Sequence, residues 1–159
     1  MPRRRFVLDQ PGGNLALDLF VLAQHLNSML DAAFAGTGVT PSQYAVYSQL
    51  GVEPMTPRVL GRSLGLAPAT VSNYLKAIEQ RGHLTRTPSA DDRRSHSVAL
   101  TAAGMAKRAE CRERMRLAVR RLDAPIGSAA ERDALREALG RLDDAVLAAH
   151  HAITERTGP

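Results

Sequence analysis

The chain has 159 residues, which suffice for one domain with its own core, and its formal net charge of +5 at pH 7 favours a negatively charged partner. The single cysteine, Cys111, excludes an intramolecular disulfide and a multi-cysteine zinc site. No apolar run reaches the length of a membrane span or forms a signal peptide, so we expect a cytoplasmic protein that contacts no membrane.

The first third of the chain predicts two helices. Residues 14–35 carry apolar side chains on one stripe at helical spacing, and Gly36 and Gly38 end this pattern. Thr40-Pro41-Ser42-Gln43 has the form of a capping box, in which the first and last side chains satisfy free amides at a helix start. A second helix is therefore expected from there to about Leu50.

Residues 56–82 predict a helix-turn-helix. Thr56-Pro57 begins one short helix, which Gly65 ends, and Pro68 begins another, which ends at Gly82. The apolar positions of the second helix recur on one face: Val71, Tyr74 or Leu75, and Ile78. The other face holds small or polar residues that suit a DNA major groove, which predicts a recognition helix. They are Ala69, Thr70, Ser72, Asn73, Lys76 and Ala77.

A basic hairpin follows this helix. Residues 83–87 and 96–100 read as two strands, and the turn-rich segment 88–95 between them carries Arg93 and Arg94. Paired arginines at a loop tip suit the backbone or the narrow minor groove of DNA. Residues 57–96 hold seven Lys or Arg against three acidic residues, a field that favours nucleic acid.

The last third predicts two more helices. Thr101 opens one that runs to about Leu122, Pro125 and Gly127 interrupt the pattern, and Ser128 caps the last helix. Apolar residues in the last helix step by three and four, as in a coiled-coil seam: Leu135, Leu139, Leu142, Val146, Ala149 and Ile153. Such a seam packs within one subunit or between two, and we expect a homodimer.

Several of these motifs resemble the MarR (multiple antibiotic resistance regulator) family of bacterial transcription factors. They are Thr40-Pro41-Ser42-Gln43-Tyr44, Leu64-Gly65-Leu66, Thr70-Val71-Ser72, Glu79-Gln80-Arg81-Gly82, Asp92-Arg93-Arg94 and Val98-Ala99-Leu100-Thr101-Ala102-Ala103-Gly104. The resemblance covers roughly residues 14–155. It implies a homodimer whose recognition helices enter successive major grooves of a pseudo-palindrome, while the wing arginines reach the adjacent minor grooves.

Two positions depart from the family's pattern. Ala67 precedes the recognition helix where the family usually has a capping Ser, Asp or Asn, so a phosphate or water is expected to satisfy the free amides. Asn73 stands where Arg is common, and because Asn pairs with adenine we expect a different base preference there.

The resemblance also implies a small aromatic or anionic effector that binds between the dimer helices and the winged domain and releases DNA. Its candidate ligand-binding residues are Phe20, Gln24, Tyr44, Tyr47 and Met115. Plain core packing explains the two tyrosines equally well.

Other chemistry is less consistent with the sequence. The five histidines form no spaced set with Cys, Asp or Glu that is typical of a metal or catalytic site, so we expect no enzymatic activity, metal or cofactor. Cys111 lies in a basic helical segment that could lower the pKa of its thiol and permit redox sensing, but a packing role is favoured.

We therefore expect a mainly α winged helix-turn-helix protein with a two-stranded β wing and long N- and C-terminal dimerisation helices. The predicted division is 1–35 for an arm and the first dimerisation helix, 36–104 for the DNA-binding domain, and 105–159 for the C-terminal dimerisation helices. The expected function is sequence-specific binding of double-stranded DNA by a homodimeric repressor, associated with the bacterial nucleoid. Thr70, Ser72, Asn73, Lys76, Asp92, Arg93 and Arg94 are the predicted DNA-binding residues.

Two other functions stay open. One is a sequence-tolerant architectural DNA-binding protein, and the other is a dimeric ligand-binding or scaffold protein with a vestigial winged domain.

Overall fold

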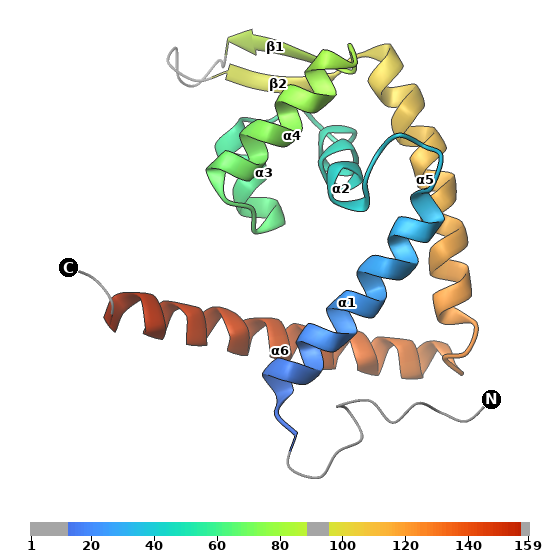
Figure 1. Ribbon diagram of the computed structural model, residues 1–159, viewed down its shortest axis with the longest axis vertical. Coiled ribbons are helices and arrows are strands. Elements are labelled where there is room, and N and C mark those ends of the chain that lie inside the picture. The colour runs from blue at the N-terminus through green and yellow to red at the C-terminus, as the bar shows by residue number, and fades with distance from the viewer. Residues whose placement is uncertain (1–12, 89–95, 157–159) are drawn as a thin grey trace. The chain divides into compact units, whose positions relative to one another are not determined.

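The fold is mainly α-helical with a two-stranded sheet, as predicted (Figure 1). The computed structural model describes residues 13–88 and 96–156. Their elements are α1 (Leu15–Phe34), α2 (Pro41–Leu50), α3 (Pro57–Leu64), α4 (Pro68–Gln80), β1 (Leu84–Pro88), β2 (His96–Leu100), α5 (Ala102–Asp123) and α6 (Ala129–Arg156).

The chain forms two compact units that meet within α5, between Ala118 and Val119. The first unit contains the helix-turn-helix and the hairpin, and the second contains the end of α5 and α6. The predicted division by role, at residues 35 and 104, follows different boundaries and stays a prediction.

Side-chain caps explain where the helices begin. Thr40 and Gln43 form the predicted capping box at the start of α2, and Thr56 Oγ1 accepts from the Val59 amide at the start of α3. Thr101 and Ser128 cap α5 and α6 in the same way. These contacts span three residues each, which is why the sequence alone located these helix starts.

The core of the first unit lies between α2, α3, α4 and the hairpin. Its fully buried large side chains come from every one of these elements and from α5: Tyr47, Leu60, Leu75, Ile78, Val46, Val71, Val98 and Cys111. Close packing of this kind fixes the rotation of each helix about its axis, because each helix has one apolar face to bury.

Helix α4 ends in a Schellman motif. The Gly82 amide donates to the Glu79 carbonyl at 2.8 Å, and the His83 amide donates to the Ile78 carbonyl at 3.2 Å. Gly82 has φ = +70°, a conformation that glycine adopts without steric cost. The predicted stop at Gly82 is thus confirmed.

The hairpin pairs β1 with β2 in antiparallel register, with Leu84 opposite Leu100 and Pro88 opposite His96. Both strands were predicted, but β1 lies one residue later than expected. His83 is outside it because its amide completes the end of α4, and Pro88, expected in the loop, is its last residue. An isolated bridge between Met55 and Val98 continues this pairing toward α3.

The second unit leaves the predicted seam of α6 exposed in the single chain. Leu135, Leu139, Val146 and Ile153 each have 47% or more of their surface accessible. These large apolar side chains recur at helical spacing and form an apolar stripe that is exposed in the single chain.

None of the helices in the described part of the chain is long and apolar enough to cross a membrane.

We predict that Ala67→Ser stabilises the winged domain. Ala67 is the N-cap of α4 and provides no side-chain hydrogen bond, whereas a Ser hydroxyl would accept from an amide of the first turn. The free energy of unfolding in urea should rise by about 1 kcal/mol. Thr56→Ala, which removes an existing cap from α3, is the matched control and should lower it by a similar amount. An unchanged or lower stability of Ala67→Ser would contradict this prediction.

Candidate nucleic-acid interface

The outer face of α4 is exposed where the sequence predicted a DNA-reading surface. Ser72, Asn73 and Lys76 are exposed, and Thr70 is half-buried. On the opposite face Val71, Leu75 and Ile78 are each at most 1% exposed. The four side chains therefore present two hydroxyls, an amide and an ammonium group from one rigidly packed helix.

The start of α4 has no side-chain cap, as predicted. Ala67 adopts the extended conformation of an N-cap, but its methyl group accepts no hydrogen bond. The first backbone bond of the helix runs from the Val71 amide to the Ala67 carbonyl. Free amides and the positive end of the helix dipole at this terminus favour a negative group.

The predicted wing residues Asp92, Arg93 and Arg94 lie outside the described residues. The structure does place the two strands that carry this segment. In the middle of β1, Arg86 forms a bidentate ion pair with Glu79 of α4. The Nε–Oε1 distance is 2.9 Å and the Nη2–Oε2 distance is 3.1 Å. This pair connects the recognition helix directly to the wing.

The Glu79–Arg86 pair shows where two of the charges counted in the sequence lie together. The count over residues 57–96 included both residues, so its net positive charge is unchanged. The ion pair lowers the pKa of Glu79 and raises that of Arg86. Arg81 also has a protein partner, because it donates to Gln43 Oε1 at 3.3 Å. Arg58, Arg62 and Lys76 remain exposed.

The predicted effector residues do not all lie together. Tyr44 and Tyr47 are buried in the core, and Met115 packs against it from α5. Phe20 and Gln24 are exposed on α1. Tyr44 stacks on Phe34 with ring centroids 5.3 Å apart, so core packing accounts for this side chain.

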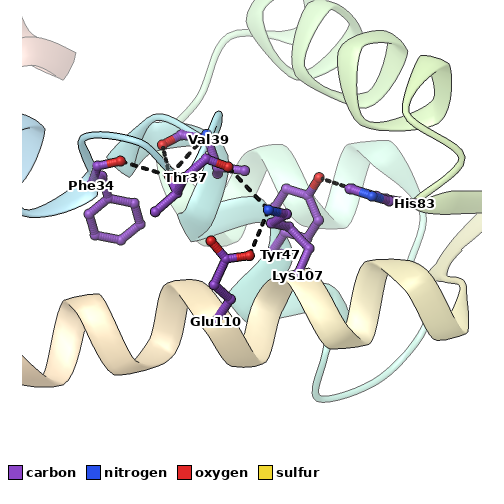
Figure 2. A network of polar contacts seen from close by, with 7 residues as sticks. All are labelled: Phe34, Thr37, Val39, Tyr47, His83, Lys107 and Glu110. Carbon is purple, nitrogen blue, oxygen red and sulfur yellow. Dashed lines mark hydrogen bonds and ion pairs between the residues drawn. The ribbon is translucent and has the colours of Figure 1, made fainter.

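A hydrogen bond that the sequence did not predict joins α2 to the turn between α4 and β1 (Figure 2). The Tyr47 hydroxyl lies 2.8 Å from Nδ1 of His83. Burial raises the pKa of Tyr47, although Arg81 and Lys107 act against this. Burial, Lys107 and Arg81 all lower the pKa of His83. The sequence analysis assigned Tyr47 only to core packing or to effector binding.

Lys107 connects α5 to the turn between α1 and α2 through hydrogen bonds (Figure 2). Its ammonium donates to the Thr37 carbonyl at 3.2 Å and to Glu110 Oε2 at 2.6 Å, and the bond to Glu110 raises the pKa of Lys107. Thr37 is itself buried, and its hydroxyl accepts from the Val39 amide and donates to the Phe34 carbonyl. The sequence did not predict this contact, because Lys107 and Thr37 lie 70 positions apart.

Cys111 is fully buried. Burial raises the pKa of its thiol, which contradicts the alternative of a lowered pKa and supports the packing role that the sequence analysis favoured. Lys107 acts in the expected direction, but loss of hydration outweighs it. Within residues 13–88 and 96–156, no group of three or more His, Cys, Asp or Glu side chains is arranged to hold a metal ion.

The fold and the exposed face of α4 define a winged helix-turn-helix protein, and comparison with known proteins shows which family its DNA-binding region resembles. Residues 37–95 match the sequence model of the MarR family. The transcriptional regulator SarZ of Staphylococcus saprophyticus is 36% identical over 67 residues, and the transcriptional repressor YetL of Bacillus subtilis is 24% identical over 103 residues. These matches confirm the resemblance to the MarR family over residues 37–95.

The chain matches only part of these two relatives, and the share is larger among solved structures. The match spans 42% of this chain and 46% of SarZ, and 63% of this chain and 62% of YetL. A probable transcriptional regulator from Pseudomonas aeruginosa is 28% identical with a TM-score of 0.74, covering 81% of this chain and 96% of that chain. The transcriptional repressor CouR, bound to a 23-mer DNA duplex, is 28% identical with a TM-score of 0.75, covering 82% and 92%.

We predict that the Cys111 thiol does not react in the folded protein. Burial hinders access and keeps the thiol protonated, and the thiolate is the reactive species. A thiol-specific chromogenic disulfide at pH 7.5 should modify the native chain far more slowly than the chain in guanidinium. Equal rates in the two states would show that Cys111 is accessible and restore redox sensing as a hypothesis.

Proposed function

We propose that this protein is a sequence-specific DNA-binding transcriptional regulator and not an enzyme. The observation that carries the proposal is the two-faced character of α4, which buries Val71, Leu75 and Ile78 and exposes Ser72, Asn73 and Lys76. A helix anchored in this way can enter a major groove without disturbing the core. CouR, a relative of similar fold, has been solved on a DNA duplex.

In this proposal the residues of α4 have separate tasks. Asn73 reads adenine through its amide, Ser72 and Thr70 contact base edges or phosphates, and Lys76 contacts a phosphate. Arg94, oriented by Asp92, reaches the minor groove, and Arg93 adds a phosphate contact. The Glu79–Arg86 pair supports this role of the wing, because it holds strand β1 against the recognition helix.

We further propose that the protein binds a pseudo-palindromic operator as a homodimer. The exposed apolar side chains of α1 and α6 support this, because they recur at helical spacing, as Leu15 and Leu22 do in α1 and Leu139 and Ile153 in α6. A second copy of the chain presents the same faces, so a two-fold interface can bury both. Repression then follows from occlusion of a promoter in the bacterial cytoplasm, where the protein is nucleoid-associated when bound to DNA.

An effector step belongs to the same proposal. A small aromatic or anionic molecule that binds near Tyr44, Tyr47 and Met115 would release DNA if it favours a dimer whose recognition helices no longer match successive grooves. Because both tyrosines are buried in the core, such a molecule must displace part of the packing between α2 and α5.

The main rival is a sequence-tolerant architectural DNA-binding protein, and a selection experiment separates the two. Purified protein should enrich a pseudo-palindrome with half-sites about 10 base pairs apart from random duplex DNA, and bind it at least about 1,000-fold better than scrambled DNA. Absence of an enriched motif, with affinity that depends on salt alone, would refute the proposal. Absence of DNA binding altogether would favour the scaffold protein with a vestigial winged domain.

Two variants that each remove one positive charge test which side chain contacts a DNA phosphate. Lys76→Gln should reduce the slope of log affinity against log salt concentration by about 1 per subunit, because it removes one phosphate contact. Arg86→Gln removes the same formal charge, but from a side chain already paired with Glu79, and should leave the slope almost unchanged. Equal effects of the two substitutions would contradict the proposed interface.

Leu139→Glu should convert the dimer to a monomer and abolish tight operator binding. Leu139 is 51% exposed in the single chain and lies on the α6 seam, where a carboxylate would lose its hydration on pairing. Arg141→Glu, two positions along and on the opposite face, is the control and should remain dimeric. Sedimentation equilibrium measures both, and a dimeric Leu139→Glu protein would exclude this seam as the interface.

A further inference from the structure

The backbone of His83 forms hydrogen bonds to the end of α4 and to the start of α5. Its amide donates to the Ile78 carbonyl at the end of α4, and its carbonyl accepts from the Thr101 amide at 3.1 Å. A side chain at Gly104 would collide with the same carbonyl oxygen, so glycine allows the first turn of α5 to approach. His83 is therefore the junction at which the recognition helix, the wing and α5 meet.

The side chain of His83 reaches a fourth element, α2 (Figure 2). Nδ1 lies 2.8 Å from the hydroxyl of Tyr47, a residue 36 positions earlier, and the two rings meet edge to face at a centroid distance of 5.9 Å. Tyr47 has no exposed surface, so its own position is fixed by the core. The contact thus ties the turn between α4 and β1 to a rigid part of the scaffold.

The charges around this contact determine which atom donates. Arg81, at the end of α4, and Lys107, from α5, both stabilise negative charge on the Tyr47 oxygen, and Lys107 is paired with Glu110. The same positive charges disfavour a protonated ring, and the neutral tautomer with an unprotonated Nδ1 lets the Tyr47 hydroxyl donate to it. Cys111, the other titratable group nearby, is buried and its thiol pKa is raised, so it adds no charge.

We propose that His83 is a positioning residue for DNA binding: its neutral ring, bonded to Tyr47, holds the α4–wing turn on α2, and protonation of the ring weakens operator binding. The inference rests on the proposed DNA-binding function. Protonation would bring a second hydrogen between Nδ1 and the hydroxyl, and would place a third positive charge beside Arg81 and Lys107. Both effects loosen the turn that sets the angle between the recognition helix and the wing.

The direction of the pH effect follows from linkage. Burial, Lys107 and Arg81 lower the pKa of His83 in the folded protein, so the unfolded chain takes up the proton first as the pH falls. The contribution of this contact to stability is complete above the unfolded pKa of about 6.5 and is lost as the pH falls through the lower folded value. Added positive charge alone would strengthen DNA binding, so a weakening at low pH has the opposite sign to the general electrostatic effect.

The test compares operator affinity at pH 7.5 and pH 5.5 for the full chain, using the operator obtained by selection and fluorescence anisotropy. The wild type should bind about three- to tenfold more weakly at pH 5.5, the amount expected for one buried hydrogen bond. His83→Asn should bind like the wild type at pH 7.5 and lose the pH effect, because the Asn amide oxygen accepts from Tyr47 but does not titrate. His150→Asn, in exposed α6, is the matched control and should keep the full pH effect.

Tyr47→Phe supplies the complementary result. It removes the donor, so binding at pH 7.5 should already be about three- to tenfold weaker and should respond little to acid. Circular dichroism checks that each variant is folded at both pH values, and His83→Gln replaces His83→Asn if the latter is not. If operator affinity falls between pH 7.5 and pH 5.5 by the same factor in the His83 variant as in the wild type, the inference about His83 is overturned. The proposed DNA-binding function is not affected by that result. A wild type with no operator preference at either pH would instead refute the proposed function.

Discussion

Burial of the inner face of α4 is the constraint on which the rest of the winged domain depends. Val71, Leu75 and Ile78 enter a core that also holds Leu60 of α3 and Val98 of β2, so three elements are positioned by the same cluster. Rotation of α4 about its axis would expose these three side chains and bury Asn73 and Lys76 without partners. The free energy of burying apolar side chains, about 1.5–3 kcal/mol each, opposes that rotation. The exposed face of α4 is therefore a consequence of how the core is packed.

Polar contacts restrict the angles between the helices and strands, because hydrogen bonds are directional and apolar contacts are not. Glu79 and Arg86 join α4 to β1 through two parallel hydrogen bonds, and Tyr47 joins His83 to α2. Lys107 joins α5 to the Thr37 turn. An exposed ion pair contributes little to stability, but its two-pronged geometry restricts orientation. If the protein meets both a major and a minor groove, as proposed, orientation matters more than a small gain in stability.

The sequence predicted those features that depend on neighbouring residues. The starts of α2, α3, α5 and α6 and the end of α4 were located because Thr, Ser and Gly act on backbone groups within one turn. The two faces of α4 followed from its apolar period. Contacts between distant residues were not predicted, because Tyr47–His83 and Lys107–Thr37 span 36 and 70 positions.

A linear pattern does not report burial or pairing. The basic neighbours of Cys111 left a lowered thiol pKa open, but its depth in the core raises this pKa and supports the packing role that was favoured. The charge count included both Arg86 and Glu79, but it did not show that these two residues pair. The family resemblance, by contrast, was confirmed, because it rests on short motifs whose spacing the linear sequence does preserve.

The central claim is that the exposed face of α4 reads DNA bases, and one measurement addresses it directly. Asn73→Ala and the wild type should be titrated against the selected operator and its complete set of single-base variants. The account predicts that the substitution removes discrimination, about 1–3 kcal/mol, at one symmetric pair of positions and leaves the other positions unchanged. Relative affinities that are identical for the two proteins at every position would contradict it.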